Sequence, residues 1–337
     1  MEGFLREVTN VFAGSLKAFD LHAMSGRLQD EFRTKLQSSN MSMLPSFHHS
    51  LPNGNERGTF LALDVGGSTF RIALVKLSGE GPDHDRVMDI KRIKAFGIDS
   101  TVRNLRGQAF FGWMAERIED VLEADHHESD SSSEPLSMAL AWSFPIEQTS
   151  TRTGSLLAMG KGFCATHGVE GKDLYELVMT SCQARKLHVA LRAIVNDSSA
   201  TLLSQAYRDP STRLSLILGT GINASVYLPV SALSPEKFGD RPKSWHAAAS
   251  HVLVNTELSM FGKTIMPGSI WDEALNAAHP MPDFQPLEHM VGGRYLGELV
   301  RLLLVEAIEA FGLFEGLMPF KLDEPYSLDT SVIAQFE

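Results

Sequence analysis

Short apolar runs separated by glycine turns set the pattern of hydrophobic and polar positions in this chain. Residues 59–63 and 70–77 are apolar and β-prone, and the run Asp64-Val65-Gly66-Gly67-Ser68-Thr69 separates them. This arrangement predicts two strands joined by a glycine hairpin. Similar apolar runs predict further strands at 87–93, 137–144, 189–195, 214–218, 223–228 and 252–256.

Apolar residues at helical spacing predict helices in other segments. Residues 105–124 carry Phe110, Met114 and Ile118 on one face, which favours a helix packed on the sheet. Further helices are predicted at 25–37, 172–186 and 270–278, with a long one at 287–311, and the remainder is expected to be loop. These strands and helices together indicate an α/β chain.

Two features divide the chain. The acidic, serine-rich segment 125–134 is interpreted as a solvated loop, with His126 and His127 exposed rather than binding metal. A proline and serines punctuate the pattern near Arg208-Asp209-Pro210. We therefore expect two regions, residues 1–209 and 210–337.

Composition restricts the partners and the compartment. The 337 residues carry a net charge of -11, which disfavours nucleic acid and anionic membranes as main partners. Charged residues interrupt the apolar stretch 295–313, so it predicts an amphipathic helix and no membrane span. Cys164 and Cys182 form no metal or redox pair, and the N-terminus has no signal-peptide pattern. A cytoplasmic protein with a small-molecule substrate or a protein partner is expected.

Two glycine turns are candidates for phosphate binding. Paired glycines in the first turn leave backbone N–H groups facing an anion, and Asp64 with nearby hydroxyls suits a hydrated divalent cation. An ordinary Gly-Gly turn explains that motif equally well when it is taken alone. The second turn, Gly219-Thr220-Gly221-Ile222-Asn223-Ala224, fits a dinucleotide fingerprint. That fingerprint requires a helix next, whereas a strand is predicted, so this turn is a second glycine hairpin.

Asn196-Asp197 ends a predicted strand, where side chains of α/β proteins often face a ligand. Asp197 is a candidate general base for a hydroxyl nucleophile. An alternative is that Asp197 is the N-cap of a helix starting at Ser198. Lys161, Glu257 and Glu288 are equally well explained, one by one, as surface residues.

The ordered motifs together resemble the eukaryotic, fungal-type hexokinase family. The resemblance rests on Met43-Leu44-Pro45-Ser46-Phe47, Pro52 to Gly58, Trp142-Ser143-Phe144-Pro145, Gly160-Lys161-Gly162-Phe163, Val195-Asn196-Asp197, Gly219 to Ala224, Val254-Asn255-Thr256-Glu257 and Glu288 to Glu298. It covers nearly the whole chain. It implies a two-lobe, actin-like ATPase (ribonuclease H-like) fold. It also implies ATP- and Mg²⁺-dependent transfer of a phosphoryl group to the 6-hydroxyl of a hexose such as glucose, fructose or mannose.

The resemblance also implies roles for individual residues. Asp197 resembles the base that takes the hydroxyl proton, with Lys161 as its catalytic neighbour. The hexose-binding residues that it implies are Ser143, Lys161, Asn196, Asp197, Asn223, Glu257 and Glu288. The implied nucleotide-binding residues are Asp64, Gly66, Gly67, Ser68, Thr69, Arg71, Gly219, Thr220 and Gly221. Asp64 and Asp197 are expected near Mg²⁺, through water.

The sequence departs from the family pattern at several places. Thr69 replaces asparagine, Met159-Gly160 replaces Trp-Thr, Ser199-Ala200 replaces Val-Gly and Leu258-Ser259 replaces Trp-Gly. The family also continues beyond the position of Glu337, so the large lobe is expected to be incomplete at the C-terminus. These departures leave an alternative open, a hexokinase-like sugar sensor with weak or no catalysis. The preferred hexose and the oligomeric state stay open.

Overall fold

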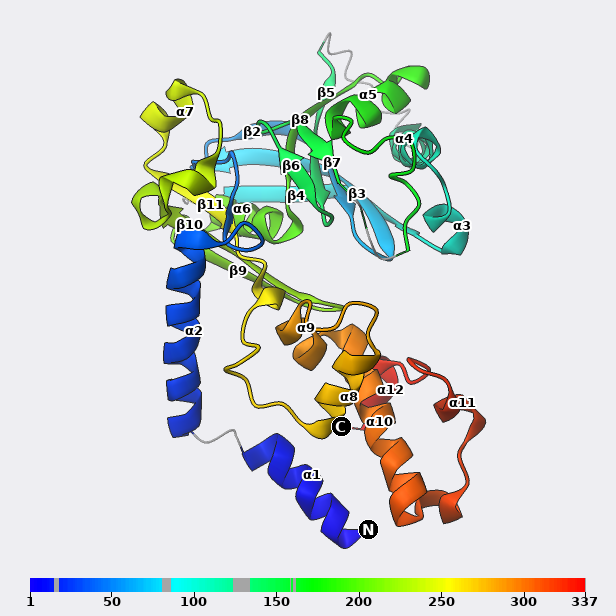
Figure 1. The fold of residues 1–337 in the computed structure, drawn as a ribbon. Coiled ribbons are helices and arrows are strands. Elements are labelled where there is room, and N and C mark those ends of the chain that lie inside the picture. The colour runs from blue at the N-terminus through cyan, green and yellow to red at the C-terminus, as the bar shows by residue number, and fades with distance from the viewer. Residues whose placement is uncertain (15–17, 81–85, 124–133, 158, 160–161, 337) are drawn as a thin grey trace.

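The computed structural model describes residues 1–14, 18–80, 86–123, 134–157, 159 and 162–336. Two lobes, each built on its own β-sheet, make up the chain (Figure 1). The first lobe holds a five-stranded sheet in the order β4-β3-β2-β5-β8, and the second holds a four-stranded sheet in the order β1-β11-β10-β9. The α/β class predicted from the sequence is confirmed.

The first sheet combines an antiparallel meander with parallel strands. Strands β2 and β3 form the predicted glycine hairpin, β4 pairs antiparallel to β3, and β5 and β8 follow parallel to β2. The strands are β2 (Arg57–Val65), β3 (Thr69–Glu80), β4 (Arg86–Gly97), β5 (Leu136–Trp142) and β8 (Val189–Val195). After β5 in the chain, β6 (Ile146–Gln148) and β7 (Gly154–Leu156) form a separate two-stranded sheet.

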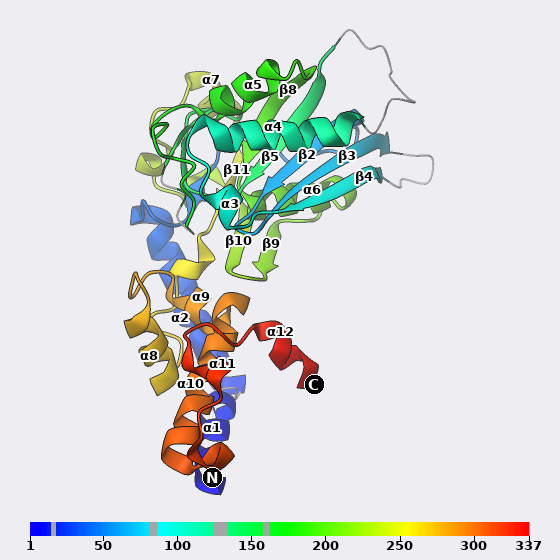
Figure 2. The ribbon, with the colours of Figure 1, turned by 90° about the vertical axis from the view of Figure 1, so that its right-hand side faces the viewer.

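Helices cover both faces of this sheet (Figure 2). Helices α4 (Gln108–Leu122) and α5 (Leu174–Ala184) pack on one face, where the apolar faces of β2 and α4 form the largest core. Helix α6 (Asp197–Arg208) lies on the other face and also contacts the second sheet. Its Tyr207 hydroxyl accepts a hydrogen bond from Gly79 N–H, and Ser215 of β9 donates to the Ser198 carbonyl. The short helix α3 (Ser100–Arg103) precedes α4.

The second lobe repeats the meander of the first. Strands β9 (Leu214–Leu218) and β10 (Ile222–Pro229) form a glycine hairpin, and β11 (His251–Asn255) pairs antiparallel to β10. Strand β1 (Leu44–Pro45) adds to β11. Helix α2 (Ala18–Ser38) and α7 (Lys243–Ala248) pack near these strands around Phe261 and Trp245.

A separate group of helices lies beyond the second sheet, at the bottom of Figure 1. It comprises α1 (Glu2–Gly14), α8 (Ile270–Ala278), α9 (Pro286–Val291), α10 (Gly293–Phe311), α11 (Phe320–Asp323) and α12 (Thr330–Ile333). Phe4 of α1 stacks on Phe311 and packs against Trp271, which gives this group a core of its own. Within the described residues, no helix combines the length and the apolar character needed to cross a membrane.

Equivalent strands of the two lobes differ in how far their apolar face is covered. In β2, Leu61, Leu63 and Val65 are at most 2% exposed, because α4 and α5 pack on them. The matching side chains of β9, counted back from its glycine turn, are Leu214, Leu216 and Leu218, which are 61%, 55% and 64% exposed. Strand β9 is also the edge of its sheet.

The structure corrects several predicted elements. The long helix predicted at 287–311 is two helices, because the backbone of Gly292 is extended between them (φ -71°, ψ 135°). The helix predicted at 25–37 begins earlier, at Ala18. Helices α1, α3, α7, α11 and α12 occupy segments that were expected to be loop. The acidic segment with His126 and His127 lies largely outside the described residues.

The covered and bare leucines provide a matched test of the fold. We expect Leu63→Ala to lower the free energy of unfolding by about 2–5 kcal/mol, because it opens a cavity in the first core. Leu216→Ala should change that free energy by no more than about 0.5 kcal/mol, because its side chain is exposed. Urea unfolding of both variants measures the difference, and equal losses would contradict the exposed face of β9.

Candidate active site

The first part of the candidate site lies where β8 ends and α6 begins. Asn196 is extended (φ -67°, ψ 152°), and its Oδ1 accepts the Ser198 N–H at 3.0 Å, so Asn196 caps the helix. The alternative that Asp197 is the N-cap is therefore wrong, and Asp197 is the first helical residue. Its carboxylate accepts hydrogen bonds from Ser143 Oγ at 2.8 Å and from Ser198 N–H at 2.7 Å.

A row of amide side chains connects this helix end to the second sheet. Asn223 Nδ2 donates to Asn196 Oδ1 at 3.4 Å and to Asn255 Oδ1 at 3.0 Å. Asn255 Nδ2 in turn donates to Glu257 Oε1 at 2.8 Å. Glu257 has left-handed backbone angles (φ 50°, ψ 54°), which are uncommon outside glycine. The predicted residues Asn196, Asp197, Asn223, Glu257 and Ser143 thus form one hydrogen-bonded group.

Helix α10 and Glu288 hold the second glycine turn in place. The N–H groups of Gly293 and Arg294, at the start of α10, donate to Gly219 O at 2.7 Å and Thr220 O at 3.0 Å. These bonds turn the carbonyls toward the helix, whose positive end suits them. Glu288 Oε2 accepts Ile222 N–H at 3.0 Å, and a Cβ on Gly221 would come within 2.2 Å of that oxygen.

The first glycine turn carries the other predicted carboxylate. Arg71 donates to Asp64 Oδ2 at 3.0 Å across the β2–β3 hairpin. Burial raises the pKa of the Asp64 carboxyl, and the nearby charge of Asp197 raises it further, whereas Arg71 opposes the shift. The influence of Asp197 puts both predicted carboxylates in one electrostatic environment. Arg103 donates to Gly67 O at 3.1 Å and so fixes the turn from α3.

Both turns have backbone donors free for an anion. Among the described residues, the N–H groups of Gly67, Ser68, Thr220 and Gly221 donate to no backbone or side-chain acceptor. Unpaired backbone N–H groups in glycine turns can bind phosphate. The described side chains form no cluster of three or more metal-ligating residues. Asp64 and Asp197 nevertheless fit Mg²⁺, which is commonly held by one or two carboxylates together with water and substrate phosphates.

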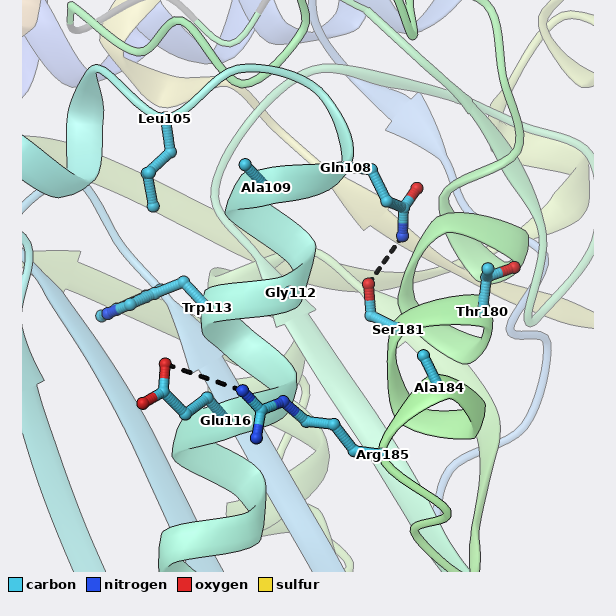
Figure 3. A pocket seen from close by; sticks show the side chains of 10 residues that line it. All are labelled: Leu105, Gln108, Ala109, Gly112, Trp113, Glu116, Thr180, Ser181, Ala184 and Arg185. Atoms are coloured by element: carbon cyan, nitrogen blue, oxygen red, sulfur yellow. Dashed lines mark hydrogen bonds and ion pairs between the residues drawn. The ribbon is translucent and has the colours of Figure 1, made fainter.

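One cavity lies beside the second turn, and another lies elsewhere in the first lobe. The first, of about 470 Å³, is lined by Thr220, Gly293, Arg294, Tyr326, Leu328, Asp329 and Thr330. The other, of about 440 Å³, is a groove between α4 and α5 (Figure 3). There Gln108 points to Ser181 and Arg185 points to Glu116. The groove contains none of the predicted site residues.

Not every functional candidate was predicted, and not every prediction falls in the described chain. Lys161 and Gly160 lie outside the described residues, so the structure says nothing of the predicted catalytic lysine. Gly66 and Thr69 lie at the first turn, where Gly66 N–H donates to Thr69 O. Asn255, which joins Asn223 to Glu257, was not among the predicted site residues. Its position at a strand end, two residues before Glu257, was the available signal.

Comparison with known proteins gives a consistent result. Hexokinase family models match residues 6–207 and 213–337. A hexokinase from Schwanniomyces occidentalis is 30% identical over 319 residues, which covers 92% of this chain and 64% of the relative. A hexokinase from Schistosoma mansoni is 33% identical over 338 residues, covering 96% of this chain and 70% of the relative. The chain spans 60% of the Kluyveromyces lactis hexokinase and 66% of Candida albicans hexokinase-2.

A solved structure supports the same assignment. The hexokinase from Schistosoma mansoni, complexed with glucose, matches with a TM-score of 0.79 and 31% identity. The match covers 98% of this chain and 72% of the other. The two lobes therefore have the fold of the actin-like, two-domain ATPases. Within that class, the chain belongs to the hexokinase family, as its ordered motifs indicated.

The contact between α10 and the second turn yields a stability prediction. A Cβ on Gly293 would lie 2.9 Å from Gly219 O, a backbone atom that cannot move alone. We expect Gly293→Ala to lower the free energy of unfolding by about 1–3 kcal/mol, as overpacking does. Gly219→Ala is the matched control, because a Cβ there meets nothing within 4 Å. Urea unfolding that ranked the two variants the other way would contradict this packing.

The environment of Asp64 predicts a pH dependence. Because its pKa is raised in the folded state, its stabilising contribution is present below the unfolded pKa, about 3.9, and is lost as pH rises through the folded value. Asn cannot ionise, so Asp64→Asn removes this pH-dependent loss of stability. The melting temperature of that variant, relative to the unsubstituted protein, should therefore rise between about pH 3.5 and pH 7.

Asp283 is the control of opposite sign. The Lys263 hydrogen bond lowers the pKa of Asp283, so its contribution is present above the unfolded pKa and is lost as pH falls. The relative melting temperature of Asp283→Asn should therefore fall as pH rises. Parallel trends for the two variants would contradict the electrostatic assignment of Asp64.

Proposed function

We propose that the protein this chain represents is an ATP-dependent hexokinase, which transfers the γ-phosphoryl group to the 6-hydroxyl of a hexose such as glucose. One observation carries the proposal. The carboxylate of Asp197, held by Ser143 and Ser198, lies within one hydrogen-bonded group that also contains Asn196, Asn223 and Glu257. Membership of the hexokinase family and the glucose complex of the Schistosoma mansoni relative support it.

The residue types suit a sugar. A hexose presents several hydroxyls, each both donor and acceptor, and amides with carboxylates satisfy them as water leaves. In this proposal Asn196, Asn223, Glu257, Glu288, Ser143 and Lys161 bind the hexose. Asp197 takes the proton from the attacking hydroxyl, and its hydrogen bonds from Ser143 and Ser198 hold the carboxylate in one orientation.

The two glycine turns would hold the nucleotide. The free N–H groups of Gly67, Ser68, Thr220 and Gly221 suit phosphate oxygens, and Asp64 with Asp197 suits hydrated Mg²⁺. Gly66, Thr69, Arg71 and Gly219 complete this proposed set. Bound Mg-ATP would supply the phosphoryl group and neutralise charge in its transfer. The proposed regions divide near residues 208–210, and the proposed location is the cytoplasm.

A second candidate is a hexose-binding regulatory protein with little or no turnover. The departures from the family pattern at Met159, Ser199 and Leu258 favour it, because each lies close in the sequence to a predicted sugar-binding residue. The two candidates share the sugar site and differ in phosphoryl transfer. Only a measurement of turnover distinguishes them.

A coupled assay of ADP release with glucose and Mg-ATP tests the first candidate. We expect Asp197→Ala to lower the glucose-dependent rate about 10²–10⁴-fold, the usual contribution of a general base. Glu309→Ala, an exposed carboxylate on α10, should leave the rate unchanged. Equal rates for the unsubstituted protein and Asp197→Ala would exclude Asp197 as the base.

Calorimetry with glucose completes the comparison. Glucose binding without ADP release would support the regulatory candidate. If glucose, fructose and mannose all failed to bind at millimolar concentration, both candidates would be overturned.

A further inference from the structure

Three buried serines lie behind Asn196. Ser198 and Ser199 follow it on α6, and Ser225 faces them from β10 of the second sheet. Their side chains are almost wholly excluded from water, with Ser198 and Ser225 0% and Ser199 1% exposed. Ser225 Oγ lies 2.8 Å from Ser198 Oγ and 2.9 Å from Ser199 Oγ. A buried hydroxyl group placed between two others is a costly arrangement unless each proton has an acceptor.

The direction of these hydrogen bonds follows from counting protons. The backbone N–H of Ser198 only donates, so the Asn196 atom 3.0 Å from it must be the acceptor Oδ1. Ser198 Oγ lies 2.6 Å from that same oxygen and therefore donates to it. Because a hydroxyl has one proton, Ser198 must accept from Ser225, and Ser225 must accept from Ser199.

We propose that Ser199, Ser225 and Ser198 form a one-way hydrogen-bond relay that fixes the side-chain amide of Asn196, and that these serines are positioning residues for sugar recognition. In this relay each hydroxyl polarises the next, which strengthens the final bond to Asn196 Oδ1. The relay also crosses from α6 to the second sheet, so the amide's orientation depends on both lobes.

The relay leaves the other half of the amide available. Because Oδ1 of Asn196 accepts hydrogen bonds from Ser198 and Asn223, the amide cannot flip without losing them. Nδ2 of Asn196 therefore points away from these partners. Nδ2 has no protein acceptor in the part of the chain that the structure describes. It therefore presents two N–H donors that suit a hydroxyl oxygen of a bound sugar. The consequence for sugar affinity rests on the proposed function, whereas the orientation of the amide does not.

Nitrogen-15 NMR of asparagine side chains tests the orientation without any ligand. The Asn196 NH₂ signals, assigned by their loss in Asn196→Ala, should be single and sharp in the unsubstituted protein. Ser225→Ala should shift or broaden them, because the relay is cut at its centre. Ser215→Ala is the matched control. Its buried hydroxyl also binds Ser198, at the backbone carbonyl and outside the relay, so the signals should not change.

A double-substitution cycle tests the consequence for binding. Calorimetry should show about three- to tenfold weaker glucose binding in Ser225→Ala, the effect of weakening one hydrogen bond, and no change in Ser215→Ala. In an Asn196→Ala background, Ser225→Ala should have no further effect, because Ser225 acts through the Asn196 amide. Ser225→Cys, which keeps a weak donor, should bind glucose with intermediate affinity and serves if the alanine variant does not fold.

Each outcome decides a separate point. Unchanged Asn196 signals in Ser225→Ala would overturn the relay. An undiminished loss of affinity in the Asn196→Ala background would overturn the positioning role, because a merely structural effect persists there. If the unsubstituted protein binds no hexose, the proposed function fails, and the NMR result alone decides the relay.

Discussion

The start of helix α6 is the constraint on which the rest of the site depends. Asn196 caps the helix with its side-chain oxygen, and this places Asp197 in the first turn, where its carboxylate reaches Ser143. The same cap directs the Asn196 amide toward Asn223 in the other lobe. One local choice, a cap at residue 196 rather than 197, therefore decides which side chains from the two sheets can meet.

The two glycine turns are held by different means. Arg71 and Arg103 secure the first turn from neighbouring elements of its own lobe. The second turn depends on a helix that follows more than seventy residues later, because the first N–H groups of α10 bind its carbonyls. Gly292 and Gly293 make that approach possible, since a side chain at either position would collide with the turn. The break between α9 and α10 thus lets the start of α10 hydrogen-bond to the second turn.

Local pattern was sufficient for much of the fold. The alternating apolar runs located β2, β3, β9 and β10, because their hydrophobic faces and glycine turns are properties of adjacent residues. The boundary at Gly292 was not predicted in this way, since the hydrogen bonds of Gly293 and Arg294 to the second turn join segments that only the folded chain brings together. Asn255 was missed because its partner Asn223 reaches it from another strand, although its other partner, Glu257, is only two residues away. The role of the serines behind Asn196 depends on burial, which a polar residue type does not reveal.

The leucine-bearing face of β9 has a practical consequence. Leu218 precedes Gly219 directly, so the exposed leucine face of β9 adjoins the turn that is proposed to bind phosphate. Exposed apolar edge strands tend to pair with other chains. Crowding of the molecules would then bring neighbours close to the turn itself. Titrations with phosphate compounds should therefore be repeated over a range of protein concentrations. Self-association through β9 would occur next to the turn and could change the apparent affinity for phosphate.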